Sequence, residues 1–250
     1  MNMTPTLAAK AAALPPEGAD FPWGGPAGNP APTLAVQRML LLSAALVLAA
    51  CGNKPKAPEW QMNAHGALER YQQAFLVGDA RVAAAEFGRA RAELAATGQA
   101  GLVARAELTR CALQVASLVI EPCAGFEPLR RDAPAAERAY ADYLAARPDP
   151  QNAALLPPQH RALAGGNAGA ATVKAIEDPL SRLIAAGVLL QSARASPEIL
   201  QLAVDTASAQ GWRRPLLAWL GAQALRAEQA GAKEETERLR RRMALVQGDQ

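Results

Sequence analysis

Hydrophobic positions recur at helical spacing throughout the chain after residue 59. Between residues 80 and 96, for example, Ala83, Phe87, Ala90 and Leu94 fall on one face of a helix by the i, i+4, i+7 rule. Alanine and leucine dominate this part of the chain, whereas the β-branched and aromatic runs typical of strands are scarce. The pattern therefore predicts an all-α fold.

Start and stop signals divide this pattern into consecutive helices. Gly78-Asp79, Thr97-Gly98 and Gly211 are stops, whereas Asp178-Pro179 and Ser196-Pro197 each join an N-cap residue to a proline at the first helical position. We expect helices over residues 60–76, 80–96, 99–119, 134–146, 169–176, 179–192, 197–210, 215–230 and 232–246. Short turns that contain glycine join neighbouring helices, which predicts antiparallel hairpins.

The helix predicted over residues 99–119 is apolar around most of its circumference, which is typical of a central, buried helix. Proline and glycine concentrate later, over residues 147–168. This composition predicts a linker between an N-terminal helical subdomain, residues 59–146, and C-terminal hairpins, residues 169–247. A pair of leucines within the linker indicates that part of it packs.

An uncharged apolar run of ten residues, Met39 to Leu48, precedes the helical region and follows the basic Arg38. At 1.5 Å per residue it covers about half of the hydrocarbon core of a bilayer, so it is too short to span a membrane. A basic flank, a short apolar helix and small residues are the three parts of a secretory leader. The alternative is a buried Ala/Leu helix that ends in a cysteine.

The tetrad Leu48-Ala49-Ala50-Cys51 at the end of this run resembles a bacterial lipobox. The resemblance implies that Cys51 receives a diacylglyceryl group, that the chain is cut just before it, and that the new amino terminus is acylated. It also implies attachment to the bacterial envelope, facing the periplasm. Gly52 is not the aspartate that commonly retains such lipoproteins at the inner membrane, which favours the outer membrane.

Residues 1–35 contain seven prolines and four glycines among small residues, a composition that predicts disorder. Leaders begin at the amino terminus, so we expect translation to start at Val36, which keeps Arg38, or at Met39. An authentic long leader is the alternative. The resulting division is a disordered segment 1–35, a signal peptide 36–50 and a lipidated tether 51–58.

The segment Gly78-Asp79 followed by Ala83, Phe87 and Ala90 resembles the second helix of a tetratricopeptide repeat, and Leu220-Gly221 resembles part of the first. The resemblance implies stacked helical hairpins over about 70 residues at most. The closing proline and a 34-residue period are missing, so an irregular α-helical bundle stays open as the alternative.

The formal net charge is +3 at pH 7, with no long run of one sign, so nucleic acid is a poor candidate partner. Three cysteines divide into Cys51 for lipid and two that can pair, Cys111 and Cys123. A disulfide fits the oxidising compartment that the leader implies. Two buried free thiols are the alternative.

Neither a catalytic centre nor a metal site is predicted. His65 and His160 lack a partner at metal-ligand spacing, so we expect structural or surface roles for both. Glu86 and Glu93 have arginines between them, which is typical of a solvated helix face rather than a carboxylate pair. No cofactor is expected besides the covalent lipid on Cys51.

One candidate contact surface stands out, Trp212 followed by Arg213 and Arg214, because tryptophan and arginine are enriched at interface hot spots. The sequence thus favours a non-enzymatic, membrane-anchored envelope lipoprotein, a protein-interaction or assembly scaffold with an envelope protein as partner. The alternatives are an envelope hydrolase acting on cell-wall glycan and a passive structural lipoprotein.

Overall fold

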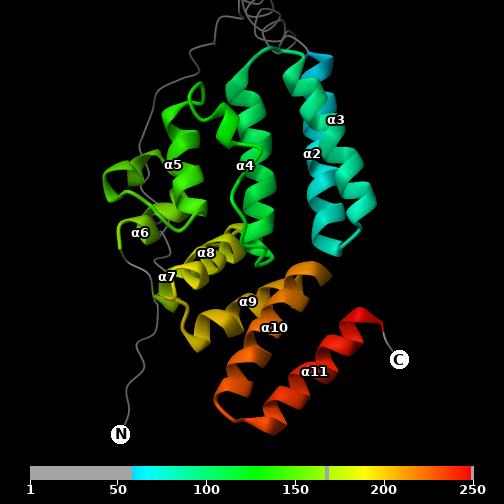
Figure 1. Cartoon of the computed structure of the whole chain (residues 1–250), viewed down its shortest axis with the longest axis vertical. Helices are drawn as coiled ribbons and strands as arrows, with labels where there is room; N and C mark the ends of the chain where they lie inside the picture. The colour runs from blue at the N-terminus through cyan, green and yellow to red at the C-terminus, as the bar shows by residue number, and fades with distance from the viewer. Residues whose placement is uncertain (1–57, 167–168, 249–250) are drawn as a thin grey trace, which may run out of the picture. The chain divides into compact units, whose positions relative to one another are not determined.

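The computed structural model describes residues 58–166 and 169–248, and the predictions for residues 1–57, including the leader helix, lie outside them. All regular structure in the described residues is α-helical or 3-10 helical, without strands (Figure 1). The predicted all-α fold is confirmed. Most predicted helix ends agree with the structure within one or two residues.

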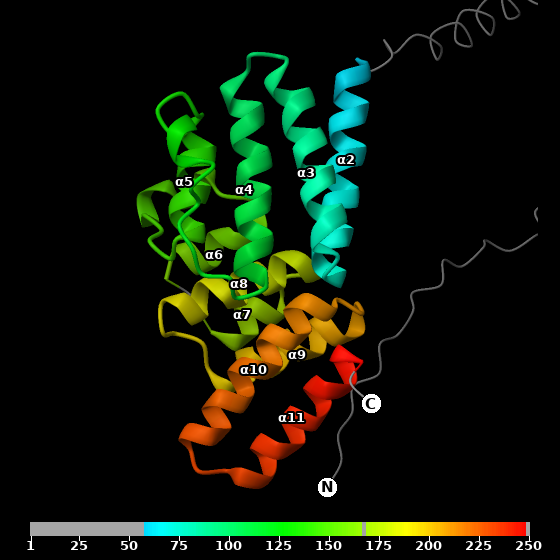
Figure 2. The ribbon, with the colours of Figure 1, turned by 45° about the vertical axis from the view of Figure 1, so that its right-hand side comes forward.

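The first hairpin pairs α2 (Glu59–Val77) with α3 (Ala80–Ala95), and the two helices lie side by side in Figures 1 and 2. Gly78 ends α2 at a φ of 92°, a left-handed conformation that favours glycine, and its N–H is hydrogen-bonded to the carbonyls of Ala74 and Phe75. Asp79 starts α3, because its side chain accepts a hydrogen bond of 3.0 Å from the Val82 N–H. Two adjacent residues thus form the whole turn.

Helix α4 (Ala100–Ala116) is the central helix that its sequence predicts. It packs against α2, α3, α5 (Ala135–Leu144) and α8 (Pro179–Gln191). Its buried side chains include Leu108 and Leu113 on different faces of the helix. The helix ends at Ala116 rather than near residue 119, because the next turn closes at Leu118, whose φ is +57°.

Residues 147–164, which lie in the predicted linker, pack against the core. Three short helices follow α5: η2 (Pro150–Leu155), η3 (Pro158–His160) and α6 (Arg161–Ala164). Leu156, His160 and Leu163 are at most 3% exposed and face the core. One hydrophobic cluster continues from α4 to Leu239 near the C-terminus. The prolines shape this segment without loosening it, because 3-10 turns tolerate them at their first positions.

The remaining helices are η1 (Glu127–Leu129), α7 (Ala170–Lys174), α8, α9 (Pro197–Ala209), α10 (Arg213–Gln229) and α11 (Lys233–Gln247). Figure 2 shows α9, α10 and α11 following one another in antiparallel order, and α10 packs against both of its neighbours. Asp178 caps α8 by accepting a 2.7 Å hydrogen bond from the Ser181 N–H. Ser196 makes no such bond to α9, although the same device was predicted there.

The α8 and α4 backbones approach each other closely at Gly187. A Cβ atom at this position would lie 2.8 Å from Cγ1 of Val115 and closer still to the Val115 carbonyl oxygen. At the next residue of α4, the fully buried Trp219 of α10 donates a hydrogen bond of 3.0 Å from its Nε1 to the Ala116 carbonyl. The end of α4 is therefore one of the places at which helices before and after residue 147 are joined.

Three glutamates are buried along α3, α4 and α5, and each is paired with an arginine from the helix before it. The pairs are Arg70 with Glu86 at 3.0 Å, Arg91 with Glu107 at 2.9 Å, and Arg105 with Glu137 at 2.5 Å. Arg89 and Arg110 supply second partners to Glu86 and Glu107. Glu86 is only 7% exposed, so its prediction as part of a solvated face was wrong.

Candidate functional site

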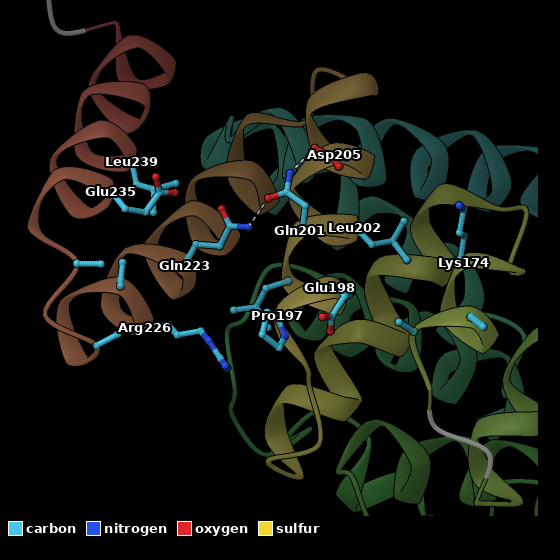
Figure 3. A pocket seen from close by; sticks show the side chains of 16 residues that line it. Lys174, Pro197, Glu198, Gln201, Leu202, Asp205, Gln223, Arg226, Glu235 and Leu239 are labelled. Carbon is cyan, nitrogen blue, oxygen red and sulfur yellow. Dashed lines mark hydrogen bonds between the residues drawn. The ribbon is translucent and has the colours of Figure 1, made fainter.

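An open groove of about 840 Å³ lies between α9 and α11, with α10 as its floor (Figure 3). We call it the α9–α11 groove. Alanines of α10 and of the turn before α11 line its base, and Leu202 of α9 and Leu239 of α11 line its sides. Helix α7 closes one end with Ala170, Ala171 and Lys174. Small and branched apolar side chains thus form a surface that a helix backbone can approach closely.

A chain of polar side chains crosses from α10 to α9 within this groove. Gln223 donates a hydrogen bond of 3.0 Å to Gln201, and Gln201 donates one of 2.8 Å to Asp205. Figure 3 shows these three side chains in a row on the groove wall. The row orients both amides, so that the groove presents donors and acceptors at defined positions beside its apolar base.

Five charged side chains line the α9–α11 groove: Lys174, Glu198, Asp205, Arg226 and Glu235. Acids exceed bases by one among them. Two hydrogen bonds from Arg238 hold the pKa of Glu235 below its usual range, so this carboxylate is ionised at neutral pH. The groove therefore combines an apolar base with a charged rim of both signs.

The predicted contact surface at Trp212 lies at the junction of α10 with α2. Arg213 donates a hydrogen bond of 3.1 Å to the Val77 carbonyl, and Arg214 donates one of 2.8 Å to the Phe75 carbonyl. The guanidinium of Arg214 also stacks on the Phe75 ring, 4.4 Å from its centroid. Trp212 is half-buried against two hydrophobic clusters. These contacts lie within the chain, and a partner at this surface stays a prediction.

Cys111 of α4 and Cys123, in the loop before η1, form a disulfide with a Cα–Cα distance of 5.8 Å. The sequence predicted this pairing. The alternative interpretation, two buried free thiols, is wrong because the two sulfur atoms are bonded. Residues 48–51 lie outside the described residues, so lipidation of Cys51 stays a prediction.

The two histidines lie in different environments. The exposed His65 is 3.3 Å from Glu69, one turn along α2. His160 is 1% exposed; its Nδ1 lies 3.1 Å from the Tyr143 hydroxyl, and burial lowers its pKa to about 4, against a smaller opposite effect of Asp178. Within the described ranges, no cluster of three or more His, Cys, Asp or Glu side chains is placed to hold a metal ion.

Sequence reasoning missed the α9–α11 groove. Its polar residues look like ordinary surface residues of two separate helices, and no motif marks them. The tetratricopeptide-like spacing concerns how hairpins pack and includes no residue that lines the groove. Only the packing of α9 and α11 on opposite sides of α10 brings these side chains together.

The fold and the groove define an all-α protein of consecutive helical hairpins with an open, helix-lined groove. No helix in residues 58–166 or 169–248 has the length and apolar character needed to cross a membrane. The chain matches no family model, and comparisons with curated proteins and with solved structures find no significant match. Function is therefore inferred from the residues themselves.

Proposed function

We propose that this protein is a non-enzymatic scaffold of the bacterial envelope, anchored by lipid on Cys51, whose α9–α11 groove holds an amphipathic helix of another envelope protein. The groove is the observation that carries the proposal. The lipobox-like tetrad supports the anchor. The disulfide supports an exported chain, because disulfides persist in oxidising compartments such as the periplasm.

The size of the groove suits a short helical segment. A helix about 10 Å wide that rises 1.5 Å per residue occupies about 120 Å³ per residue. The groove volume of about 840 Å³ then corresponds to about seven residues, or two helical turns. A segment of seven residues presents the i, i+3 and i+4 side chains that a helix uses to dock into an apolar groove.

The lining also indicates the chemistry of the partner helix. Alanines at the base leave room for leucine-sized side chains on the docking face. Because acids exceed bases on the rim, the flanks of the partner helix should carry a net positive charge, with at least one acid to meet Arg226 or Lys174.

Site-specific photo-crosslinking in cells tests this role. A photoreactive residue at Gln201 should capture one envelope protein, whereas the same residue at the exposed Gln73 of α2 should not. Ala230→Trp, at an exposed position of the groove, should abolish the Gln201 product without unfolding the chain. A synthetic peptide of the captured segment should gain helicity when it binds the full chain.

Three outcomes would count against the scaffold: identical products from Gln73 and Gln201, capture of a second copy of this chain, or a captured segment that stays non-helical when bound. The anchor has a separate test. Cys51→Ser should abolish lipid labelling and leave an unprocessed precursor, and normal processing of this variant would refute the anchor alone.

A further inference from the structure

A second cavity, of about 460 Å³, lies between α4, α5 and residues 155–161, apart from the α9–α11 groove. We call it the Tyr140 cavity. Its volume falls within the range of small-molecule sites, about 300–1,000 Å³. Leu108, Leu156 and two prolines make up much of its wall, and Leu155, which is 42% exposed, lies at the same cavity. An apolar ligand would cover Leu155, one of the large hydrophobic side chains that the fold leaves exposed.

Polar groups in this cavity have unused hydrogen-bonding capacity. Glu137 is 6% exposed; Arg105 binds its Oε1, but its Oε2 is buried without a hydrogen-bond partner. A buried acceptor without a donor costs about 1–3 kcal/mol, so a donor from a ligand would be favourable here.

Two donors lie in the same cavity. Tyr140 lines it, and burial raises the pKa of its phenol, so the hydroxyl keeps its proton and can donate. Arg161 uses its Nε for the Leu156 carbonyl, at 2.9 Å, which leaves the two terminal nitrogens of its guanidinium to face a ligand. A planar guanidinium and a phenol together suit a carboxylate.

We propose that the Tyr140 cavity binds a small zwitterion with a short apolar side chain, the chemistry of a free aliphatic amino acid. Glu137 accepts from the ammonium group, Arg161 and Tyr140 donate to the carboxylate, and the leucines and prolines contact the side chain. Arg105, Arg161 and Glu137 sum to one positive charge, so a ligand with an ammonium group alone is disfavoured. A carboxylate alone would leave Glu137 without its donor.

Calorimetry with the full chain and L-leucine tests the proposal. L-leucine should bind, whereas 4-methylpentanoate, which lacks the ammonium group, and 3-methylbutylamine, which lacks the carboxylate, should bind about tenfold more weakly, the effect of losing one charged contact. Glu137→Gln should weaken the binding of L-leucine, which loses its ammonium contact, and should not weaken the binding of 4-methylpentanoate. Tyr140→Phe should weaken the binding of both L-leucine and 4-methylpentanoate. It removes a hydroxyl that makes no hydrogen bond within the described residues, so it is the variant to use if Glu137→Gln fails to fold.

Gln223→Ala, in the α9–α11 groove, is the matched control and should leave L-leucine binding unchanged. No binding of L-leucine at millimolar concentration would overturn the proposal. So would equal binding of 4-methylpentanoate, or affinity for L-leucine that survives Tyr140→Phe and Arg161→Gln. Because the groove and the cavity share no lining residue, failure here leaves the scaffold proposal intact.

Discussion

Gly187 offers a sharp test of how α8 packs on α4. Substituting alanine for a glycine inside a helix ordinarily stabilises it by up to about 1 kcal/mol. At Gly187 the added methyl group would meet the Val115 side chain at 2.8 Å and the Val115 carbonyl oxygen at a shorter distance still. A backbone oxygen cannot rotate away as a flexible side chain does, so the two helices must move apart.

The magnitude follows from these opposing effects. Overpacking a core by one methyl group costs about 1–3 kcal/mol, and the backbone contact puts Gly187→Ala at the upper end. After subtraction of the helix-propensity gain, we expect a net loss of about 2 kcal/mol. For a domain of this size that corresponds to a fall in Tm of about 4–8 °C.

Gly88→Ala is the matched control, because Gly88 is an exposed residue inside α3 and a Cβ there would meet nothing within 4 Å. This variant should gain up to about 1 kcal/mol. Thermal and urea unfolding of the full chain, followed by circular dichroism, measures both. If Gly187→Ala were as stable as Gly88→Ala, the close α4–α8 approach would be refuted.

Three further predictions concern stability. Loss of the Cys111–Cys123 disulfide, by double substitution with alanine or by reductant, should cost about 3 kcal/mol, because the bond closes a loop of sequence separation 12; identical urea midpoints with and without reductant would contradict this. The pKa of His160 is about 4 in the folded chain and about 6.5 in the unfolded chain, so the unfolded chain takes up a proton first as the pH falls. The free energy of unfolding should therefore carry the full contribution of His160 above pH 6.5 and should fall by about 3 kcal/mol as the pH drops to 4. His160→Gln should flatten that part of the pH profile, and an unchanged profile would show that other groups produce it. Glu107→Gln removes a buried charge shared by two partly exposed arginines and should cost about 3 kcal/mol. Glu93→Gln, at a half-buried residue whose carboxylate accepts an exposed hydrogen bond from Asn63, should cost under about 0.5 kcal/mol.

Much of the fold was predictable because helix signals are local. Asp79 and Asp178 cap their helices from three residues away, and Gly78 ends α2 through its own φ angle. Such signals act within a few residues, so a single sequence carries them. The disulfide was also predictable, since the turn at residues 121–122 brings two cysteines of nearby sequence together.

The α9–α11 groove and the Tyr140 cavity were less predictable, because the side chains that line each of them come from different helices. Glu137 and Arg161 line one cavity although they are far apart in sequence and belong to different helices. Glu86 was mistaken for a surface residue, because its charged neighbours along α3 are the same whether Glu86 faces solvent or faces Arg70 of α2. The orientation of a polar side chain depends on its partner helix, which no local pattern specifies.

The sequence by itself thus determined where helices begin and end, that the fold is all-α, and that α4 is buried. It also carries the lipobox-like tetrad, on which the proposed lipid anchor at Cys51 rests. Tertiary structure alone decided that Arg213 and Arg214 bind the end of α2 and that α9 and α11 form a groove. The reason is physical: capping and periodicity act over one or two turns, whereas the way helices cross is set by side-chain packing between elements far apart in the chain.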